Sequence, residues 1–175
     1  DSIIKYGSLA TKILKERPVP YLLLGSAYYR KDAAEEAVGA LEKGETYAQD
    51  KGLKFEFYSL IAECYMKLKN FSQSDNYFDK AIEIDNSNTG VRNNYAYYLA
   101  LRKERLKFAR ELSEYTVKKE PENSTFLDTY GWVLFVSGKT AKAKKYIEQA
   151  LKNGGDKNSE VLAHYGDILF KLKRY

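Results

Sequence analysis

The sequence predicts an all-α protein in which antiparallel helices stack into a solenoid. The first observation is a pair of apolar helical patterns at residues 124–137 and 140–153, separated by Gly138. Glycine readily adopts the left-handed conformation that ends many helices, so the pair predicts a helical hairpin. The second observation is that small residues occur where the two helices would meet, at Gly131, Ala143 and Ala150. A lone hairpin cannot bury its apolar face, and we therefore expect copies on both sides of it.

One residue pattern recurs along the chain and supplies these copies. A small residue stands among large apolar ones at five places, with spacings of 37, 34, 35 and 35 residues: Gly25, Ala62, Ala96, Gly131 and Gly166. The pattern resembles the tetratricopeptide repeat (TPR) family, whose unit is a helical hairpin of about 34 residues. The resemblance implies a right-handed TPR superhelix of about ten antiparallel helices, of the kind found in bacterial multi-repeat proteins. Three departures from the family pattern predict locally looser packing: Gly44, Ser74 and Thr116.

The first part of the chain divides into helices at its proline and polar clusters. Residues 3–16 carry apolar residues at helical spacing, and Pro18 follows them, so 1–17 is interpreted as the second helix of a preceding repeat. Repeat 18–54 opens on Pro18 and predicts helices near 20–31 and 33–50, the latter long because no breaker precedes Lys51-Gly52. Repeat 55–88 predicts helices near 54–68 and 71–84, closed by a turn at 85–88. Asn70 is interpreted as the cap of the second of these helices.

The second part of the chain continues the same alternation. Repeat 89–123 predicts helices near 89–102 and 105–119 and ends at Pro121, because proline disfavours helical geometry in the residue before it. Repeat 124–158 is the hairpin described above, with Asn123 as a cap and Gly154-Gly155 after its second helix. Residues 159–175 predict a helix near 158–172, interpreted as the first helix of a following repeat. The sequence thus predicts a single TPR solenoid over 1–175.

Charge is distributed unevenly along the chain. Residues 1–88 carry 12 basic and 14 acidic side chains, whereas residues 89–175 carry 17 basic and 10 acidic ones. The basic excess favours either a solvated outer helix face or electrostatic binding of nucleic acid or anionic membrane by 89–175. The interspersed acidic residues favour the first alternative. No apolar run of about 18 residues predicts a membrane span.

The residue types present predict neither catalysis nor a cofactor. A structural zinc site usually needs four Cys or His ligands, and the chain has only Cys64 and His164. The two lie far apart in the predicted stack, which disfavours a Cys–His nucleophile. We interpret Cys64 as a packing thiol and His164 as a surface side chain. No phosphate-binding loop is present, because Gly154-Gly155 is not followed by lysine and serine or threonine.

The TPR resemblance implies that a partner would bind the concave face, which the first helix of each repeat lines. The positions carried over from the family place an aromatic, mildly acidic set of side chains on that face: Glu63, Asn93, Tyr97, Asp128, Trp132, Phe135 and Asp167. Lys and Arg are absent from the positions that one TPR subgroup uses to clamp carboxylates, so that activity is not implied. The set predicts a scaffold or adaptor that binds a peptide or helix with apolar anchors and basic neighbours.

The predicted end helices have apolar side chains without a predicted neighbour. Leu162, Leu169 and Phe170 stand where a following helix or a ligand would cover them. Exposing several large apolar side chains is unfavourable, by about 1.5–3 kcal/mol for each one. We therefore expect residues 1–175 to be a segment of a longer repeat protein and to self-associate through the end helices. The compartment stays open, with a preference for the bacterial envelope that rests on the resemblance alone.

Overall fold

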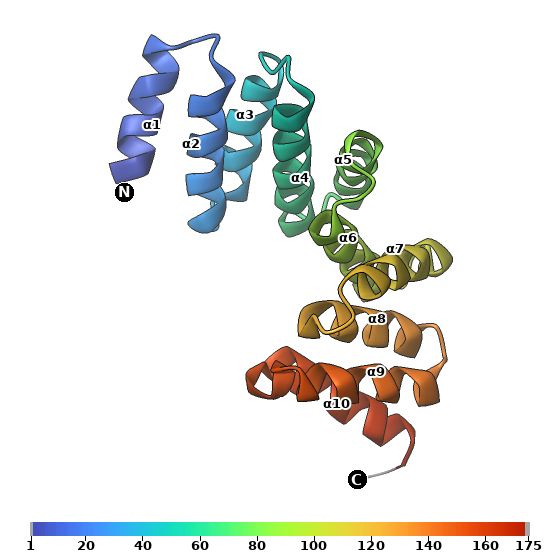
Figure 1. Ribbon diagram of the computed structural model, residues 1–175. Coiled ribbons are helices and arrows are strands. Elements are labelled where there is room, and N and C mark those ends of the chain that lie inside the picture. Colours follow the sequence, from blue (N-terminus) through green and yellow to red (C-terminus); the bar gives the residue numbers. More distant parts are fainter. Residues whose placement is uncertain (1, 174–175) are drawn as a thin grey trace. The chain divides into compact units, whose positions relative to one another are not determined.

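The computed structural model describes residues 2–173, and every regular element in that range is helical (Figure 1). The chain forms two compact units that divide between Ser87 and Asn88. The N-terminal unit contains α1 (Ser2–Ile13), α2 (Pro18–Arg30), α3 (Ala34–Glu45), α4 (Lys51–Lys67) and α5 (Phe71–Ile84). The C-terminal unit contains α6 (Thr89–Arg102), α7 (Leu106–Lys119), α8 (Ser124–Val136), α9 (Thr140–Lys152), the 3-10 turn η1 (Gly155–Lys157) and α10 (Ser159–Lys171).

The helices pack as hairpins, most extensively α2 with α3, α4 with α5, α6 with α7, and α8 with α9. The side chains between paired helices are the most deeply buried ones of each unit. In the N-terminal unit they include Leu41, Phe57, Ile61 and Phe78. In the C-terminal unit they include Tyr95, Leu99, Leu112, Leu134 and Ile147. This is the all-α TPR solenoid that the repeat pattern predicts.

Small residues allow the paired helices to approach closely, as the pattern predicts. A Cβ atom added at Gly131 would lie 2.6 Å from Cδ1 of Ile147, and one added at Gly25 would lie 2.4 Å from Cγ of Leu41. The equivalent Gly166 on α10 has open space at this position.

The predicted looser packing at three departures is not what the structure has. Gly44 is tightly enclosed, since a Cβ atom there would lie 2.4 Å from Cβ of Tyr21. Ser74 is buried, and its hydroxyl donates to the Ala62 carbonyl at 2.9 Å. The buried Thr116 hydroxyl likewise donates to the Ser113 carbonyl at 2.8 Å. The Ser74 bond crosses from α5 to α4 and the Thr116 bond lies within α7, so both hydroxyls are paired.

The turn inside each hairpin has one recurring geometry. A left-handed residue closes the first helix in all four hairpins, directly after it at Lys103 and two residues after it at Asp32, Lys69 and Gly138; the φ angles of Asp32, Lys69, Lys103 and Gly138 are 62, 57, 56 and 80°. The next amide then donates to a carbonyl five residues earlier, as from Lys139 to Leu134 at 2.8 Å. This is the Schellman arrangement, which satisfies the last carbonyls of a helix. Only Gly138 marks the turn with a residue that adopts this conformation without strain.

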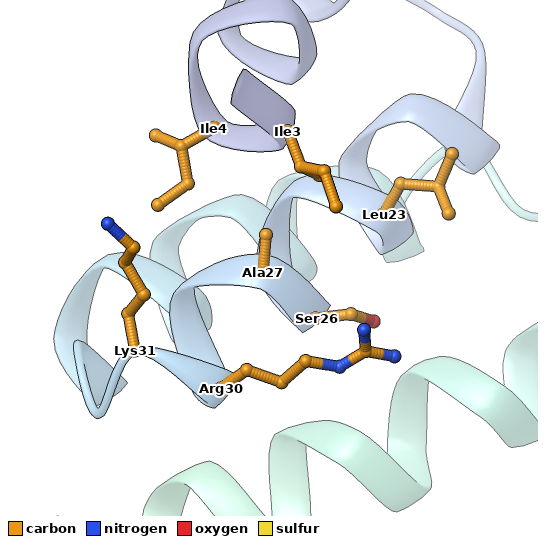
Figure 2. Close-up of a pocket in the computed structure, with 7 residues that line it drawn as sticks. All are labelled: Ile3, Ile4, Leu23, Ser26, Ala27, Arg30 and Lys31. Atoms are coloured by element: carbon orange, nitrogen blue, oxygen red, sulfur yellow. The ribbon is translucent and has the colours of Figure 1, made fainter. Parts of the chain in front are cut away.

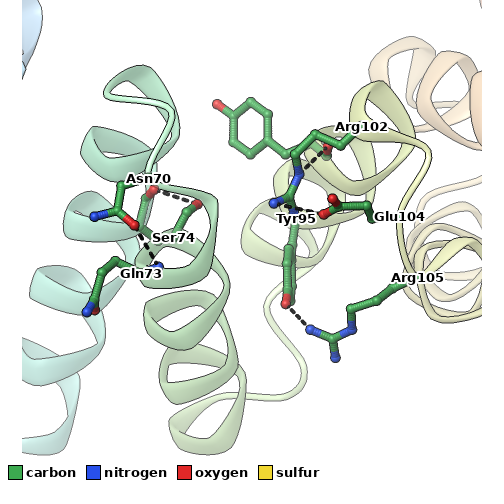
Figure 3. Close-up of polar contacts among 9 residues, drawn as sticks. Asn70, Gln73, Ser74, Tyr95, Arg102, Glu104 and Arg105 are labelled. Carbon is green, nitrogen blue, oxygen red and sulfur yellow. Dashed lines mark hydrogen bonds and ion pairs between the residues drawn. The ribbon is translucent and has the colours of Figure 1, made fainter.

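Asparagine side chains begin several helices. The Asn70 carboxamide accepts from the Gln73 amide at 3.4 Å (Figure 3). Asn123 accepts from the Thr125 and Phe126 amides at 3.1 and 3.3 Å. Both predicted caps are thus confirmed. The start of α7 is different, because Arg105 precedes it in a left-handed conformation and its guanidinium donates to the Tyr95 hydroxyl.

The second helix of the first full repeat is shorter than predicted. α3 ends at Glu45 rather than near residue 50, and the Tyr47 and Ala48 amides bond in tight turns to the Gly44 and Glu45 carbonyls. Asp50 then caps α4 by accepting from the Leu53 amide at 2.9 Å, so α4 begins at Lys51. The three additional residues of this repeat lengthen the connection and the start of α4, not α3. No helix within 2–173 has the length and apolarity required to cross a membrane.

Candidate functional site

A polar pocket lies among the first helices of the C-terminal unit. It has a volume of about 170 Å³ and is lined by Asn93, Asn94, Tyr97, Thr125, Asp128, Thr129, Asn158, Glu160 and Val161. These residues come from α6, α8 and the start of α10. The lining includes two carboxylic acids and no lysine or arginine. We call this feature the α6–α8–α10 pocket.

Asp128 is the buried acid of the pocket. It is 5% exposed, and both of its carboxylate oxygens lie near Nδ1 of His164, at 2.9 and 3.1 Å. A carboxylate can only accept, so Nδ1 carries the proton and donates. The imidazole is also buried and stacks on Trp132, with ring centroids 4.1 Å apart and planes 16° from parallel. Trp132 and His164 therefore hold Asp128 in place from beneath the pocket.

Tyr97 and Glu160 form a second polar pair at the pocket. The Tyr97 hydroxyl donates to the Glu160 carboxylate. Burial, and next this hydrogen bond and the Glu160 charge, raise the pKa of Tyr97 well above its usual range. The phenol is therefore neutral at physiological pH and remains a donor. Its ring lies 6.3 Å from that of His164, which joins the two pairs into one cluster.

Asn93 contributes an unpaired acceptor to the pocket. It is 4% exposed, and its Oδ1 atom is buried without a partner among the described residues. An unsatisfied buried polar atom typically costs about 1–3 kcal/mol. The indole Nε1 of Trp132 is unpaired in the same way within residues 2–173. Such atoms are uncommon in folded proteins.

The structure brings together part of the predicted groove set. Asn93, Tyr97 and Asp128 line one pocket, and Trp132 lies next to it with Phe135, whose ring centroid is 5.2 Å away. Asp167 is exposed on α10 and does not line the pocket. Glu63 belongs to the N-terminal unit, where it accepts from the Tyr29 hydroxyl at 2.8 Å. The assignment of all seven residues to one binding surface stays a prediction.

The prediction for His164 was wrong. His164 is 6% exposed and bonds to Asp128, whereas the sequence analysis placed it on the surface. Its repeat position is usually peripheral, but here a carboxylate one repeat earlier gives the imidazole a buried partner. Glu160 and Asn158 were also missed. Glu160 and His164 are four residues apart, which places them on one face of a helix, and this spacing could have indicated the polar cluster.

A second hollow occurs in the N-terminal unit, between α1 and α2 (Figure 2). Its volume is about 230 Å³, and Figure 2 shows Ile3 and Ile4 on one side of it and Leu23, Ser26, Ala27, Arg30 and Lys31 on the other. Most of the lining is aliphatic. The cationic side chains are those of Arg30 and Lys31, at the C-terminal end of α2. This hollow offers apolar contact but no convergent polar set, and sequence reasoning did not find it.

The tetratricopeptide repeat family model matches residues 55–88, which are α4, α5 and the turn after them. The chain is a tetratricopeptide repeat protein. The TPR repeat-containing protein PA4667 of Pseudomonas aeruginosa is 32% identical to it over 148 residues, and the match covers 84% of this chain. The type IV pilus assembly protein PilF of the same organism is 27% identical over 158 residues, covering 89% of this chain. The TPR chain spans 24% and 60% of the lengths of these relatives.

Solved structures share the TPR fold. The structure of Pseudomonas aeruginosa PilF has a TM-score of 0.75 at 24% identity, covering 89% of this chain and 69% of that one. YrrB, described as a TPR protein with an unusual peptide-binding site, also has a TM-score of 0.75, at 16% identity, and the match covers 91% of this chain and 80% of YrrB. The tetratricopeptide repeat match at residues 55–88 supports a protein-interaction scaffold in general, because TPR proteins are generally non-catalytic scaffolds.

Proposed function

We propose that this chain is a scaffold that binds a partner peptide or helix on the first-helix surface of its C-terminal unit. This surface comprises the α6–α8–α10 pocket and the adjacent rings of Trp132 and Phe135. The observation that carries the proposal is the pocket itself, in which Asn93 is buried with an unpaired oxygen beside the hydrogen-bonded Asp128. A packed structural core would pair such atoms, whereas a peptide can supply the missing hydrogen bonds.

The aromatic residues beside the pocket support a peptide as the ligand. Tyr97, Trp132 and Phe135 are each half-buried, so each presents part of a ring to solvent. Tyrosine and tryptophan are enriched among residues that dominate binding energy, because a ring contributes a large contact area with few rotatable bonds. The structural neighbour YrrB is described as having a peptide-binding site, and PilF as a pilus assembly protein.

The proposal is tested with a random peptide library displayed on phage and selected against the full chain. We expect selected peptides to bind wild type and to lose at least about 2 kcal/mol of binding energy with Trp132→Ala, a roughly thirtyfold increase in Kd. Tyr115→Ala is the matched control, because Tyr115 is a half-buried aromatic residue on α7. Circular dichroism checks that each variant is folded. Peptides that lose affinity with Tyr115→Ala but not with Trp132→Ala would contradict the proposal.

The basic residues of 89–175 suggest the alternative of electrostatic binding, but many of them have acidic or aromatic partners. Lys144 pairs with Glu148, Lys118 with Glu114 at 3.2 Å, and the Arg92 guanidinium lies 4.3 Å from the Tyr115 ring centroid. The alternative predicts a steep loss of affinity for nucleic acid or anionic vesicles as salt rises. A peptide complex held by aromatic anchors depends on salt much less.

A further inference from the structure

We propose that the α6–α8–α10 pocket receives a basic side chain of the partner, and specifically the guanidinium of an arginine. This inference rests on the proposed function, which it narrows from peptides in general to peptides with an arginine anchor. It depends on three features of the pocket: its two carboxylates in a lining without lysine or arginine, its unused acceptor atoms and its aromatic wall.

The lining of the pocket has an excess of acidic side chains. Two carboxylates line it, Asp128 and Glu160, and the lining contains no lysine or arginine. Within residues 2–173, the hydrogen-bond donor to Asp128 is Nδ1–H of His164, which both oxygens share. A carboxylate offers about four acceptor positions, so most of the capacity of Asp128 is unused. A buried charge is stabilised when an opposite charge pairs with it, and this favours a cation as the ligand.

The acceptor atoms fit a ligand that donates several hydrogen bonds at once. Asn93 has an unpaired carboxamide oxygen, and Asp128 and Glu160 contribute carboxylate oxygens from α8 and α10. A guanidinium has five N–H donors in a planar fork, whereas an ammonium group is a compact point charge with three. The pocket volume of about 170 Å³ exceeds by more than tenfold the roughly 10–15 Å³ that one water needs, so a planar group can enter.

The aromatic wall favours arginine over lysine for a second reason. Tyr97 lines the pocket, and its hydroxyl is already committed to Glu160, so its ring is fixed there. Guanidinium groups stack on aromatic faces and are more weakly hydrated than ammonium groups. The same Tyr97–Glu160 bond restrains the Glu160 carboxylate, so two walls of the pocket are held in position before a ligand arrives.

The test uses two small probes, N-acetyl-arginine amide and its neutral analogue N-acetyl-citrulline amide. Each is titrated into the full isotope-labelled chain while amide chemical shifts are recorded. We expect the arginine probe to cause saturable shifts at Asn93, Asp128, Glu160 and His164, and the citrulline probe to cause none there. N-acetyl-lysine amide should bind more weakly than the arginine probe. Equal shifts from the arginine and citrulline probes would overturn the proposal.

Two variants test whether the charge of Asp128 is required for binding of the arginine probe. Asp128→Asn keeps the size of the side chain and removes its charge, and we expect it to weaken the arginine probe about tenfold or more. Glu111→Gln removes an exposed acid on α7, outside the pocket, and should leave the affinity unchanged. Equal losses in both variants would contradict a specific site. If library peptides still bind through Trp132 while the arginine probe does not bind, the arginine inference is wrong and the proposed scaffold function stands.

Discussion

At the scale of single residues, the pairing of Asp128 with His164 explains how an acid is kept inside a helical repeat. Nδ1 of the imidazole donates to the carboxylate and the ring lies against Trp132, so the buried acid has a hydrogen-bond donor among the packed helices. This pairing links the stability of the C-terminal unit to the geometry of its pocket. Removing the donor therefore has a predictable cost.

We predict that His164→Phe, which keeps a ring against Trp132, destabilises the C-terminal unit by about 1–3 kcal/mol or more, because Asp128 remains buried without a donor. Urea unfolding followed by fluorescence checks this, since the chain has one tryptophan and it lies in this unit. The double variant with Asp128→Leu should lose less stability than the sum of the single variants. Additive losses would show that the two side chains do not stabilise each other.

Cys64 gives a prediction for the N-terminal unit. Burial, followed by the Glu63 charge, raises the pKa of the Cys64 thiol to about 12, against about 8.5 for a free cysteine. The unfolded chain therefore loses this proton at lower pH than the folded chain, and stability falls as pH rises from about 9 to about 12. Burial also raises the pKa of Tyr65, to about 12, which acts in the same direction. Below about pH 8 neither group makes the stability depend on pH.

The measurement compares wild type with Cys64→Ala by urea unfolding at several alkaline pH values. We expect the stability of the variant to decline less steeply than that of wild type above about pH 9. Iodoacetamide should label Cys64 slowly in the folded chain and rapidly in urea, because the thiolate is the reactive form. Identical pH slopes for the two proteins would show that the thiol does not titrate differently on folding.

At the scale of helices, the small residue of each repeat has a role that depends on its neighbour. Gly131 faces Ile147 of α9, whereas Gly166 on α10 faces open space. We predict that Gly131→Leu destabilises the C-terminal unit by about 1–3 kcal/mol through overpacking. The same change at Gly166 should be neutral or stabilising by up to about 1 kcal/mol, because leucine favours a helix more than glycine does.

The measurement compares the melting temperatures of wild type and of the two glycine variants. The comparison tests whether the glycine at this repeat position is needed because two helices approach closely there. A wild-type melting temperature for Gly131→Leu, or equal losses at both positions, would contradict the packing described for α8 and α9.

The helices could largely be predicted from the sequence, because apolar periodicity and asparagine caps are local signals. The end of α3 could not, since Gly44 lies inside the helix and no glycine or proline occurs between Glu45 and Gly52. The left-handed turns at Asp32, Lys69 and Lys103 could not be predicted either, because the left-handed residue is not a glycine. Gly138 is the one of the four that marks its turn in the sequence. His164 was misplaced because its environment depends on Asp128, 36 residues earlier in the chain. The repeat register predicts which face of its helix a residue occupies. It does not predict which polar residue of a neighbouring helix lies opposite that face.

At the scale of the whole molecule, exposed apolar side chains bear on the expected self-association. On α1, Ile3, Tyr6 and Ile13 are 59, 64 and 70% exposed, and Phe170 on α10 is 73% exposed. Such patches commonly mark interaction sites. We predict that sedimentation velocity shows concentration-dependent association, and that Ile3→Glu with Ile13→Glu reduces it. Leu101→Glu, at a side chain that is 46% exposed on α6, is the control. A monomer at every concentration would contradict the prediction.

The central claim is that the first-helix surface of the C-terminal unit binds the partner. Chemical-shift mapping of the isotope-labelled chain with a library-selected peptide tests it most directly. The account predicts that the largest perturbations fall on α6, α8 and α10, at Asn93, Tyr97, Asp128, Trp132 and His164, with little change on α7 and α9. Perturbations confined to α7 and α9 would place the binding site on the basic helices and contradict the account.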